Sequence, residues 1–311
     1  MVKQPKISVV SAIYNSSHIV SEFISEVKKQ LKNVTPEYEL ILVDDGSGDD
    51  SWLEIEKNCS IEMRIKGIKL SKNFGQQIAL SAGLRKASGK KIIILDSDLQ
   101  NPPEAIPLLL ENLDLGFDIV YTVSKIRNNW WDEFTSSIFW YIINSFFKVN
   151  MVPNQLMMRA FTKKTLTYFN GYEERIRFIA GITHDLGLPF KVLSIENNRR
   201  KEGKGNYTFL KRFQLMIDLI ISSTIQPLNF LIYFSLFCFI MTIIFFARSL
   251  IYYVVYPDVP LGYTTMVTII SFFGSTTLIF LGLIGRYLSN IYAEVRQRPL
   301  FVIDSTINIH R

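Results

Sequence analysis

Two long stretches without a charged side chain, residues 219–247 and 259–285, constrain the fold of this chain more than any other feature. Each stretch exceeds the roughly 20 apolar residues that a helix needs to cross a lipid bilayer. We therefore expect two transmembrane helices, at 226–256 and 263–289. The alternative, a buried helical hairpin of a soluble domain, is the weaker interpretation because apolar stretches of this length are typical of membrane spans.

The distribution of basic residues predicts the orientation of these helices. The connector at 256–262 contains no Lys or Arg, whereas basic residues precede and follow the pair. These flanking residues are Lys211, Arg212, Arg286, Arg296 and Arg298. Because basic flanks favour the cytoplasmic side of a membrane, we expect both termini in the cytoplasm and the connector outside. The chain would then be a multi-pass protein of the cell's inner (plasma) membrane.

The remainder of the chain is long enough for one sizeable domain, which we expect at 1–208 on the cytoplasmic side. We expect a juxtamembrane amphipathic helix at 209–225 and a cytoplasmic tail at 290–311. The formal net charge of +6 is modest and no known nucleic-acid-binding module is present, so we predict no nucleic-acid partner. Basic residues gathered within 199–212 favour contact with membrane lipids instead. The two cysteines are isolated and predict neither a disulfide framework nor a zinc site.

Strand and helix patterns alternate through the first part of the chain. The expected strands are 7–13, 39–43, 65–70, 91–95 and 117–121, and the expected helices are 17–32, 50–58, 75–87 and 103–113. In the first helix, the spacing places one apolar set on a single face: Ile19, Val20, Phe23, Ile24, Val27 and Leu31. This alternation predicts an α/β fold with a largely parallel sheet, whose ligand site lies beyond the carboxyl ends of the strands. The aromatic-rich segment at 130–148 fits a membrane-surface helix and a core segment equally well.

A pair of carboxylates, Asp96 and Asp98, directly follows the apolar run at 92–95. Side chains of a strand alternate between its faces, so carboxylates at positions i and i+2 point the same way. Without Cys or His nearby, they suit a hard divalent cation such as Mg²⁺ or Mn²⁺, which takes waters and substrate phosphates as its other ligands. The alternative is a strand-end turn with solvated acids.

Six sequence blocks together resemble the family 2 glycosyltransferases with a GT-A (Rossmann-like) fold. The blocks are SVVSAIYN (8–15), ELILVDDGSGDDS (39–51), LSKNFGQQIALSAGL (70–84), IILDSDLQNPPEAIP (93–107), RRKEGKGNY (199–207) and LGLIGRYLSNIYAEVRQRP (281–299). The subgroup they resemble most is the membrane-anchored polyprenyl-phosphate glycosyltransferases, which includes dolichyl-phosphate mannose synthase-like and bactoprenol glucosyltransferase-like enzymes. The resemblance covers nearly the whole chain and implies a GT-A catalytic domain followed by a two-helix transmembrane hairpin.

The resemblance implies a site for a nucleotide-sugar donor. The residues it assigns to this site are Ala12, Tyr14, Asp44, Asp45, Asp96 and Ser97. Ala12, Tyr14 and Asp45 would hold the base and ribose, and Asp44 would orient the loop. Simpler structural roles are alternatives: Tyr14 could belong to the core, and Asp44 could cap the Gly46 turn. Asn73 and Gly75 fit a helix start better than a ligand contact.

The resemblance also implies the metal and acceptor sites. Asp98 would ligate Mg²⁺ or Mn²⁺, with Asp96 near the ribose or diphosphate and Gln100 assisting. The polyprenyl-phosphate acceptor would be held by Arg127, Arg200 and Lys204. Asp96, Asp98 and Arg200 are thus the expected catalytic residues. A homo-oligomer, a tetramer, is a further implication of the resemblance.

The chain departs from the family pattern at four places, one of which is Ser16, where an acidic residue often follows Tyr-Asn. The Asp that usually precedes the arginine matching Arg159 is missing from PNQLMM at 153–158. Basic residues expected near 132–133 are Asp132 and Glu133, and the usual Gly-Glu-Ser-Lys-Tyr loop is GKGNY at 203–207. The donor site and membrane anchor are therefore better supported by the sequence than the acceptor site.

These features predict a metal-dependent, inverting glycosyltransferase that transfers a sugar from a nucleotide-sugar to undecaprenyl phosphate, with UDP as the first choice of nucleotide. The enzyme would act at the cytoplasmic face of the membrane, in the synthesis or modification of cell-surface polysaccharide. One alternative is a membrane-bound transferase whose acceptor is a hydroxyl of a lipid-linked saccharide. A second is a non-catalytic membrane scaffold, against which the intact carboxylate pair argues. A processive synthase is disfavoured because its Gln-x-x-Arg-Trp signature is absent.

The uncharged connector predicts a specific labelling result. A cysteine introduced by Asp258→Cys, in a chain whose Cys59 and Cys238 are replaced by serine, should react with a membrane-impermeant maleimide added to intact cells. A cysteine at Ser305 serves as the matched cytoplasmic control and should react only after permeabilisation. Labelling of position 258 only after permeabilisation would contradict the expected topology.

Overall fold

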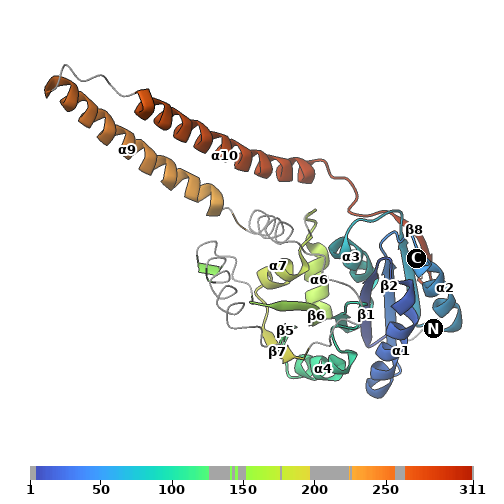
Figure 1. Ribbon diagram of the computed structural model, residues 1–311. Helices are drawn as coiled ribbons and strands as arrows, with labels where there is room; N and C mark the ends of the chain where they lie inside the picture. The colour runs from blue at the N-terminus through green and yellow to red at the C-terminus, as the bar shows by residue number, and fades with distance from the viewer. Residues whose placement is uncertain are drawn as a thin grey trace. The chain divides into compact units, whose positions relative to one another are not determined.

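The structure is a computed structural model that forms two compact units. The first unit comprises Met1–Trp140, Asn150–Asn206 and Arg298–Arg311, and the second comprises Tyr141–Val149 and Tyr207–Gln297. The residues that the structure describes are 5–125, 141, 144–145, 152–175, 177–196, 224, 226–255 and 263–309. The chain therefore leaves the first unit twice and returns to it each time, the last time after α9 (Gln226–Val255) and α10 (Tyr263–Val295) (Figure 1).

The first unit is built on an eight-stranded mixed sheet with strand order β7-β5-β6-β4-β1-β2-β3-β8. The strands are β1 (Ile7–Ile13), β2 (Tyr38–Asp44), β3 (Ile65–Leu70), β4 (Lys91–Ile94), β5 (Ile119–Ser124), β6 (Gln155–Thr162), β7 (Phe190–Ile195) and β8 (Ile303–Ile307). Neighbouring strands from β4 through β1 and β2 to β3 are parallel, as are β5 and β7. β6 runs antiparallel to both β4 and β5, and β8 runs antiparallel to β3. The predicted, largely parallel α/β sheet is confirmed.

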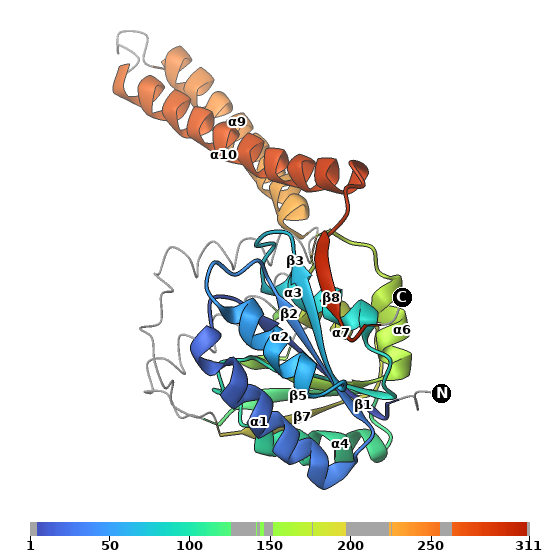
Figure 2. The same ribbon diagram turned by 90° about the vertical axis from the view of Figure 1, so that its right-hand side faces the viewer.

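Helices cover both faces of the sheet (Figure 2). The helical segments are α1 (Ser17–Val34), α2 (Ser51–Ile61), α3 (Gln76–Lys86), the 3₁₀ turn η1 (Pro103–Ala105), α4 (Ile106–Asp114), α6 (Lys163–Gly171) and α7 (Ile179–Asp185). One hydrophobic cluster joins α1, α2 and α4 to one face, and a second joins α3, α6 and α7 to the other. Val9 belongs to the first cluster and Val10 to the second, as alternation along a strand requires. All six apolar residues predicted for the inner face of α1 are buried.

The last part of the chain differs from the simple tail expected at 290–311. α10 continues to Val295, and β8 adds to the edge of the sheet beside β3. The Ser71 N–H donates to the Val302 carbonyl at 3.0 Å, and the Asn308 side-chain amide donates to the Cys59 and Ile65 carbonyls at 2.8 Å each. Pairing satisfies backbone groups that an open edge at β3 would leave exposed.

The second unit contains two long apolar helices, α9 (Gln226–Val255) and α10 (Tyr263–Val295), which lie side by side (Figures 1 and 2). The Phe234 and Phe280 rings meet edge to face at 5.7 Å, and the Tyr287 hydroxyl donates to the Thr224 carbonyl at 2.8 Å.

Both helices are long and apolar enough to cross a membrane. The candidate spans are Gln226–Phe245 and Phe272–Val295. The apolar part of each span has no residue buried inside the protein. The lack of burial argues against the buried hairpin of a soluble domain. The amphipathic helix predicted at 209–225 and the segment at 130–148 fall almost wholly outside the described residues.

A buried carboxylate, that of Glu39 on β2, joins three elements of the first unit. Only 1% of Glu39 is exposed, and its carboxylate pairs with the Lys66 ammonium at 2.5 Å. It also accepts hydrogen bonds from the Ser8 hydroxyl at 2.5 Å and from the Ser88 N–H at 2.7 Å. Burial raises the pKa of the carboxyl, but the hydrogen bonds from Lys66, Ser8 and Ser88 outweigh it and hold that pKa below its usual range.

Replacing this carboxylate should destabilise the first unit. We expect Glu39→Gln to lower the free energy of unfolding at pH 7 by about 2 kcal/mol, because the partly buried Lys66 ammonium loses its counter-ion. Because the pKa of Glu39 is lower in the folded chain, its contribution is complete above pH ~4.5 and is lost as the pH falls through the folded value. Thermal unfolding of detergent-purified protein should therefore show a gap to wild type that narrows in acid. Glu26→Gln, which removes a long 3.9 Å surface pair with Lys29, is the control and should unfold like wild type.

Candidate active site

The carboxyl ends of three neighbouring parallel strands bring the predicted donor residues to one edge of the sheet. β1 lies between β2 and β4 and is parallel to both. Ala12 and Tyr14 stand at the end of β1, Asp44 and Asp45 at the end of β2, and Asp96 just beyond β4. The expected convergence of the three motifs is therefore present.

Asp45 fixes the backbone that leads into α3. The residue is 2% exposed, and its two carboxylate oxygens accept the Phe74 N–H at 2.8 Å and the Gly75 N–H at 2.9 Å. Burial raises the pKa of Asp45, although these backbone hydrogen bonds oppose the rise. Gly75 has a φ of +97°, which glycine adopts without strain. The carboxylate of Asp45 therefore shapes the wall of the site through this loop.

Asp44 caps the adjacent turn, which is one of the two roles open to it from the sequence. It is fully buried and accepts hydrogen bonds from the hydroxyl and the backbone N–H of Ser47, the latter at 3.4 Å. Burial raises its pKa, against these hydrogen bonds. The turn needs Gly46, whose φ is +67°, because a Cβ there would lie 2.3 Å from the Lys72 carbonyl carbon. The turn at Gly46 and the loop at Lys72 are therefore in backbone contact.

A pocket of about 230 Å³ opens at this edge. Its lining residues are Ala12, Ile13, Tyr14, Ser16, Asp45, Asn73, Gly75, Gln76 and Ser97. Four predicted donor residues, Ala12, Tyr14, Asp45 and Ser97, thus share one cavity. Tyr14 is 49% exposed and is therefore not a core residue.

The sequence favoured a helix start over a ligand contact for Asn73 and Gly75, and it did not single out Gln76. Gly75 is the residue before α3, and all three also line the pocket. Their signal was present in the LSKNFGQQ block, which precedes a helix and carries three amide side chains.

The Asp96 carboxylate is held by two amide side chains. It accepts a hydrogen bond from the Gln76 amide at 2.7 Å and one from the Asn101 amide at 3.1 Å. Burial and, next, the negative charge of Asp98 raise the pKa of Asp96 to about 6, against the opposing charge of Arg159 and both hydrogen bonds. The two carboxylates therefore repel each other.

The loop after Asp96 has a strained backbone. One Asp98 oxygen accepts the Gln100 N–H at 3.1 Å. Between them, Leu99 has a φ of +55°, an unfavourable conformation for a bulky residue, and its side chain is buried in the core. Burial of Leu99 thus holds the turn that carries Asp98. Because β4 ends at Ile94, both carboxylates lie beyond the strand, and the alternation of strand side chains that was expected to align them does not apply.

The chemistry of these groups fits a divalent cation. Two carboxylates that repel each other, with the amide oxygen of Gln100 close in sequence, offer the oxygen ligands that Mg²⁺ and Mn²⁺ prefer. Within the described residues, no group of three or more His, Cys, Asp or Glu side chains gathers to hold a metal. A cation at Asp96 and Asp98 would therefore take most of its ligands from water and substrate phosphates.

Arg159 on β6 is a charged residue of this region to which sequence reasoning gave no role. It is 3% exposed, and its guanidinium donates to the Met157 and Leu156 carbonyls at 3.0 Å each. Burial lowers its pKa to about 10, while Tyr121 and Asp96 act in the opposite direction. The signal in the sequence was a single arginine within the otherwise apolar run at 156–161.

The acceptor residues predicted from the sequence, Arg127, Arg200 and Lys204, lie outside the described residues. Their assignment to the acceptor phosphate stays a prediction.

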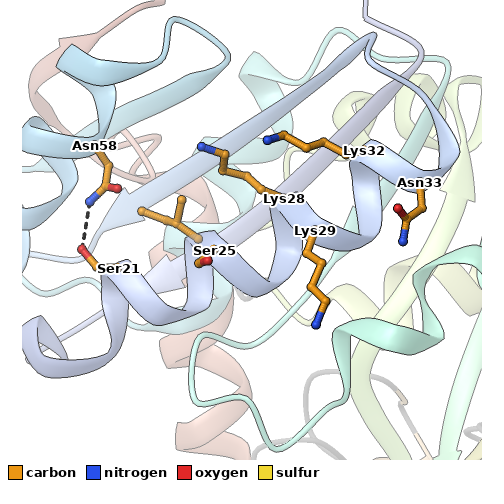
Figure 3. Close-up of a pocket in the computed structure, with 8 residues that line it drawn as sticks. Ser21, Ser25, Lys28, Lys29, Lys32, Asn33 and Asn58 are labelled. Carbon is orange, nitrogen blue, oxygen red and sulfur yellow. Dashed lines mark hydrogen bonds between the residues drawn. The ribbon is translucent and has the colours of Figure 1, made fainter.

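A larger pocket of about 500 Å³ lies along α1 and is rich in lysine (Figure 3). Lys28, Lys29 and Lys32 line it, and Asn58 of α2 donates to the Ser21 hydroxyl at 3.0 Å across it. The Lys28 ammonium pairs with the Glu62 carboxylate. None of the predicted site residues lines this pocket, so it is separate from the strand-end site.

Comparison with known sequences gives the family. Residues 8–170 match the family model described as glycosyl transferase family 2. An uncharacterized glycosyltransferase of Synechocystis sp. is 30% identical over 301 residues, which cover 96% of this chain and 94% of that protein. The undecaprenyl-phosphate 4-deoxy-4-formamido-L-arabinose transferase of Proteus mirabilis is 30% identical over 312 residues, which cover 98% of this chain and 95% of the relative.

Solved structures share the fold at low sequence identity. A mannosyltransferase from Pyrobaculum calidifontis, in complex with GDP-Man and Mn²⁺, has a TM-score of 0.50 at 16% identity over 70% of this chain and 63% of its own. The Mycobacterium tuberculosis glucosyl-3-phosphoglycerate synthase, with Mn²⁺, UDP and glucosyl-3-phosphoglycerate, has a TM-score of 0.50 at 18% identity over 71% and 80%. With the family match and relatives along nearly its whole length, this chain belongs to glycosyl transferase family 2 and has the GT-A-like fold.

Proposed function

We propose that this protein transfers a sugar, with inversion, from a nucleotide-sugar donor, UDP-linked in the first instance, to undecaprenyl phosphate at the cytoplasmic face of the plasma membrane. The observation that carries the proposal is the Asp96–Asp98 pair beside the pocket of Ala12, Tyr14 and Asp45. Two apolar helices in the same chain, long enough to span a bilayer, support a lipid substrate.

On the donor side, one set of residues would bind the base and ribose, and another would bind the diphosphate through a cation. The exposed Tyr14 ring and the loop held by Asp45 would bind the base and ribose, with Ser97 at the pocket wall. Asp98, with Asp96 and the Gln100 amide oxygen, would hold Mg²⁺ or Mn²⁺. Such a cation, when bound, supplies Lewis-acid stabilisation of the leaving diphosphate.

On the acceptor side, the proposal needs no strong general base. A phosphate monoester has a second pKa of about 6, so it is already an anionic nucleophile at neutral pH. The absence of the family's usual Asp from residues 153–158 is compatible with this chemistry. The Proteus mirabilis relative named as an undecaprenyl-phosphate transferase supports the same acceptor.

A hydroxyl of a lipid-linked saccharide is the second candidate acceptor. The observation that favours it is the pair Asp132 and Glu133, which stand where basic residues are expected to receive a phosphate. A hydroxyl would require a general base that an anionic phosphate does not.

Neutralising one carboxylate should remove the transferase activity. We expect Asp98→Asn to lower transfer from a panel of UDP- and GDP-sugars to undecaprenyl phosphate by about 100-fold or more, or ~3 kcal/mol of barrier, because the leaving diphosphate loses part of its stabilisation. The assay is run with purified protein at limiting Mn²⁺. Asp304→Asn, an exposed carboxylate on β8, is the control and should keep full activity. Near-wild-type transfer by Asp98→Asn at limiting Mn²⁺ would disprove the metal assignment.

The two acceptor candidates differ in their dependence on Arg200. A guanidinium can grip a phosphate with two hydrogen bonds, so Arg200→Ala should lower transfer to undecaprenyl phosphate by at least about 100-fold in neutral detergent. The adjacent Arg199→Ala is the matched control and should have a small effect. If the two variants behave alike and retain activity without anionic lipid, Arg200 is a headgroup contact, and the hydroxyl acceptor becomes the better candidate.

A further inference from the structure

The donor loop, residues 71–75, connects β3 to α3 and forms one wall of the strand-end pocket. Asn73 and Gly75 line that pocket, and the Phe74 and Gly75 N–H groups donate to the Asp45 carboxylate at 2.8 and 2.9 Å. A connecting loop is held in place by the contacts that it makes with other elements, because it has no regular backbone pairing of its own. The shape of the pocket therefore depends on every element that contacts this loop.

The end of the chain supplies one of these contacts. β8 pairs with β3 as an antiparallel strand (Figure 2), and Leu70 lies opposite Ile303 at the end of this pairing. One residue further along β3, the Ser71 N–H donates to the Val302 carbonyl at 3.0 Å. The register of the pair shifts just before Leu70, and irregularities of this kind re-aim a strand and are common next to active sites. The first residue of the donor loop is therefore held by the segment that returns from α10.

The same segment also contacts α3, the element that follows the donor loop. Phe301 packs against the hydrophobic cluster to which α3 contributes, and the Arg85 guanidinium of α3 lies over the Phe301 ring, 5.4 Å from its centroid. At the other end of β8, the Asn308 side-chain amide donates to two backbone carbonyls at 2.8 Å each. The returning segment, residues 301–309, is thus fixed at both ends and contacts the elements on both sides of the donor loop.

We propose that residues 301–303 position the donor loop, so that nucleotide binding depends on the segment that returns from α10. The inference rests on the proposed glycosyltransferase function and gives that function positioning residues outside the pocket. α10 ends at Val295, and residues 296–300 alone separate it from Phe301. The apolar helix and the donor pocket are thereby joined through one short piece of chain and the hydrogen bond from Ser71 to Val302.

Such a coupling acts in both directions. If the returning segment orders the donor loop for the nucleotide, the bound nucleotide stabilises the contact between segment and loop by the same free energy. UDP or GDP with Mn²⁺ should therefore slow hydrogen exchange of the backbone N–H groups in residues 301–309 as well as in 71–75. β7, at the opposite end of the sheet, is the internal control and should respond less.

Two alanine substitutions in the returning segment separate positioning from stability. Phe301→Ala removes the ring that contacts α3, whereas Ile307→Ala removes a partly buried side chain at the far end of β8, opposite Gly67. Calorimetry with Mn²⁺ measures the binding of UDP and of GDP to full-length wild type and to both variants. We expect Phe301→Ala to bind the preferred nucleotide about tenfold more weakly, a usual size for coupling between sites, and Ile307→Ala to stay within about twofold of wild type.

Three results would overturn the inference. They are wild-type nucleotide affinity in Phe301→Ala, an equal loss of affinity in both variants, and nucleotide-bound wild type whose residues 301–309 are protected no more than β7. The exchange measurement on wild type needs no substitution, so it decides the inference if Phe301→Ala does not fold.

A wild type that binds neither UDP nor GDP would refute the proposed donor and leave the positioning role open to a separate measurement. Hydrogen exchange of residues 71–75 without nucleotide then decides it. Faster exchange in Phe301→Ala than in Ile307→Ala would support positioning of the loop, and equal exchange in the two variants would overturn it.

Discussion

The repulsion between two carboxylates at the end of β4 is the interaction around which the rest of the site is organised. Asp96 is half-buried, and this burial and the negative charge of Asp98 raise its pKa. Gln76 and Asn101 hold Asp96 by hydrogen bonds, and the buried charge of Arg159 partly offsets the repulsion. Each of these neighbours comes from a different element, so the sheet must be assembled before the pair can be held in place. The repulsion that these neighbours do not offset favours the binding of a divalent cation.

The same sheet also takes up the chain where it returns from the two apolar helices. Arg298–Arg311 returns from α10 to the first unit, where β8 completes the edge beside β3. The apolar hairpin is therefore an insertion with two covalent connections to the catalytic unit. β8 also covers an edge strand that would otherwise present unpaired backbone groups.

Periodicity explains what the sequence could predict and what it could not. The strands β1 to β4 and the buried face of α1 were predicted because apolar runs and 3.6-residue spacing are local signals. β6, β7 and β8 were not predicted, since their pairing depends on residues far away in the chain. Arg159 was given no role for the same reason. Asp96, whose charge acts on Arg159, follows β4, and β4 pairs with β6 in an antiparallel arrangement that local spacing does not reveal. The pocket residues, by contrast, follow from strand ends, and parallel pairing of adjacent strands places those ends together.

The segment that leads into β6 departs from the family pattern in a way that bears on the acceptor. The usual Asp is missing from residues 153–158, and this segment carries no negative charge. A further carboxylate beside Asp96 and Asp98 would add to their repulsion and would also repel an anionic phosphate acceptor. An acceptor that is already ionised needs no general base, so the proposed reaction does not require a carboxylate in this segment.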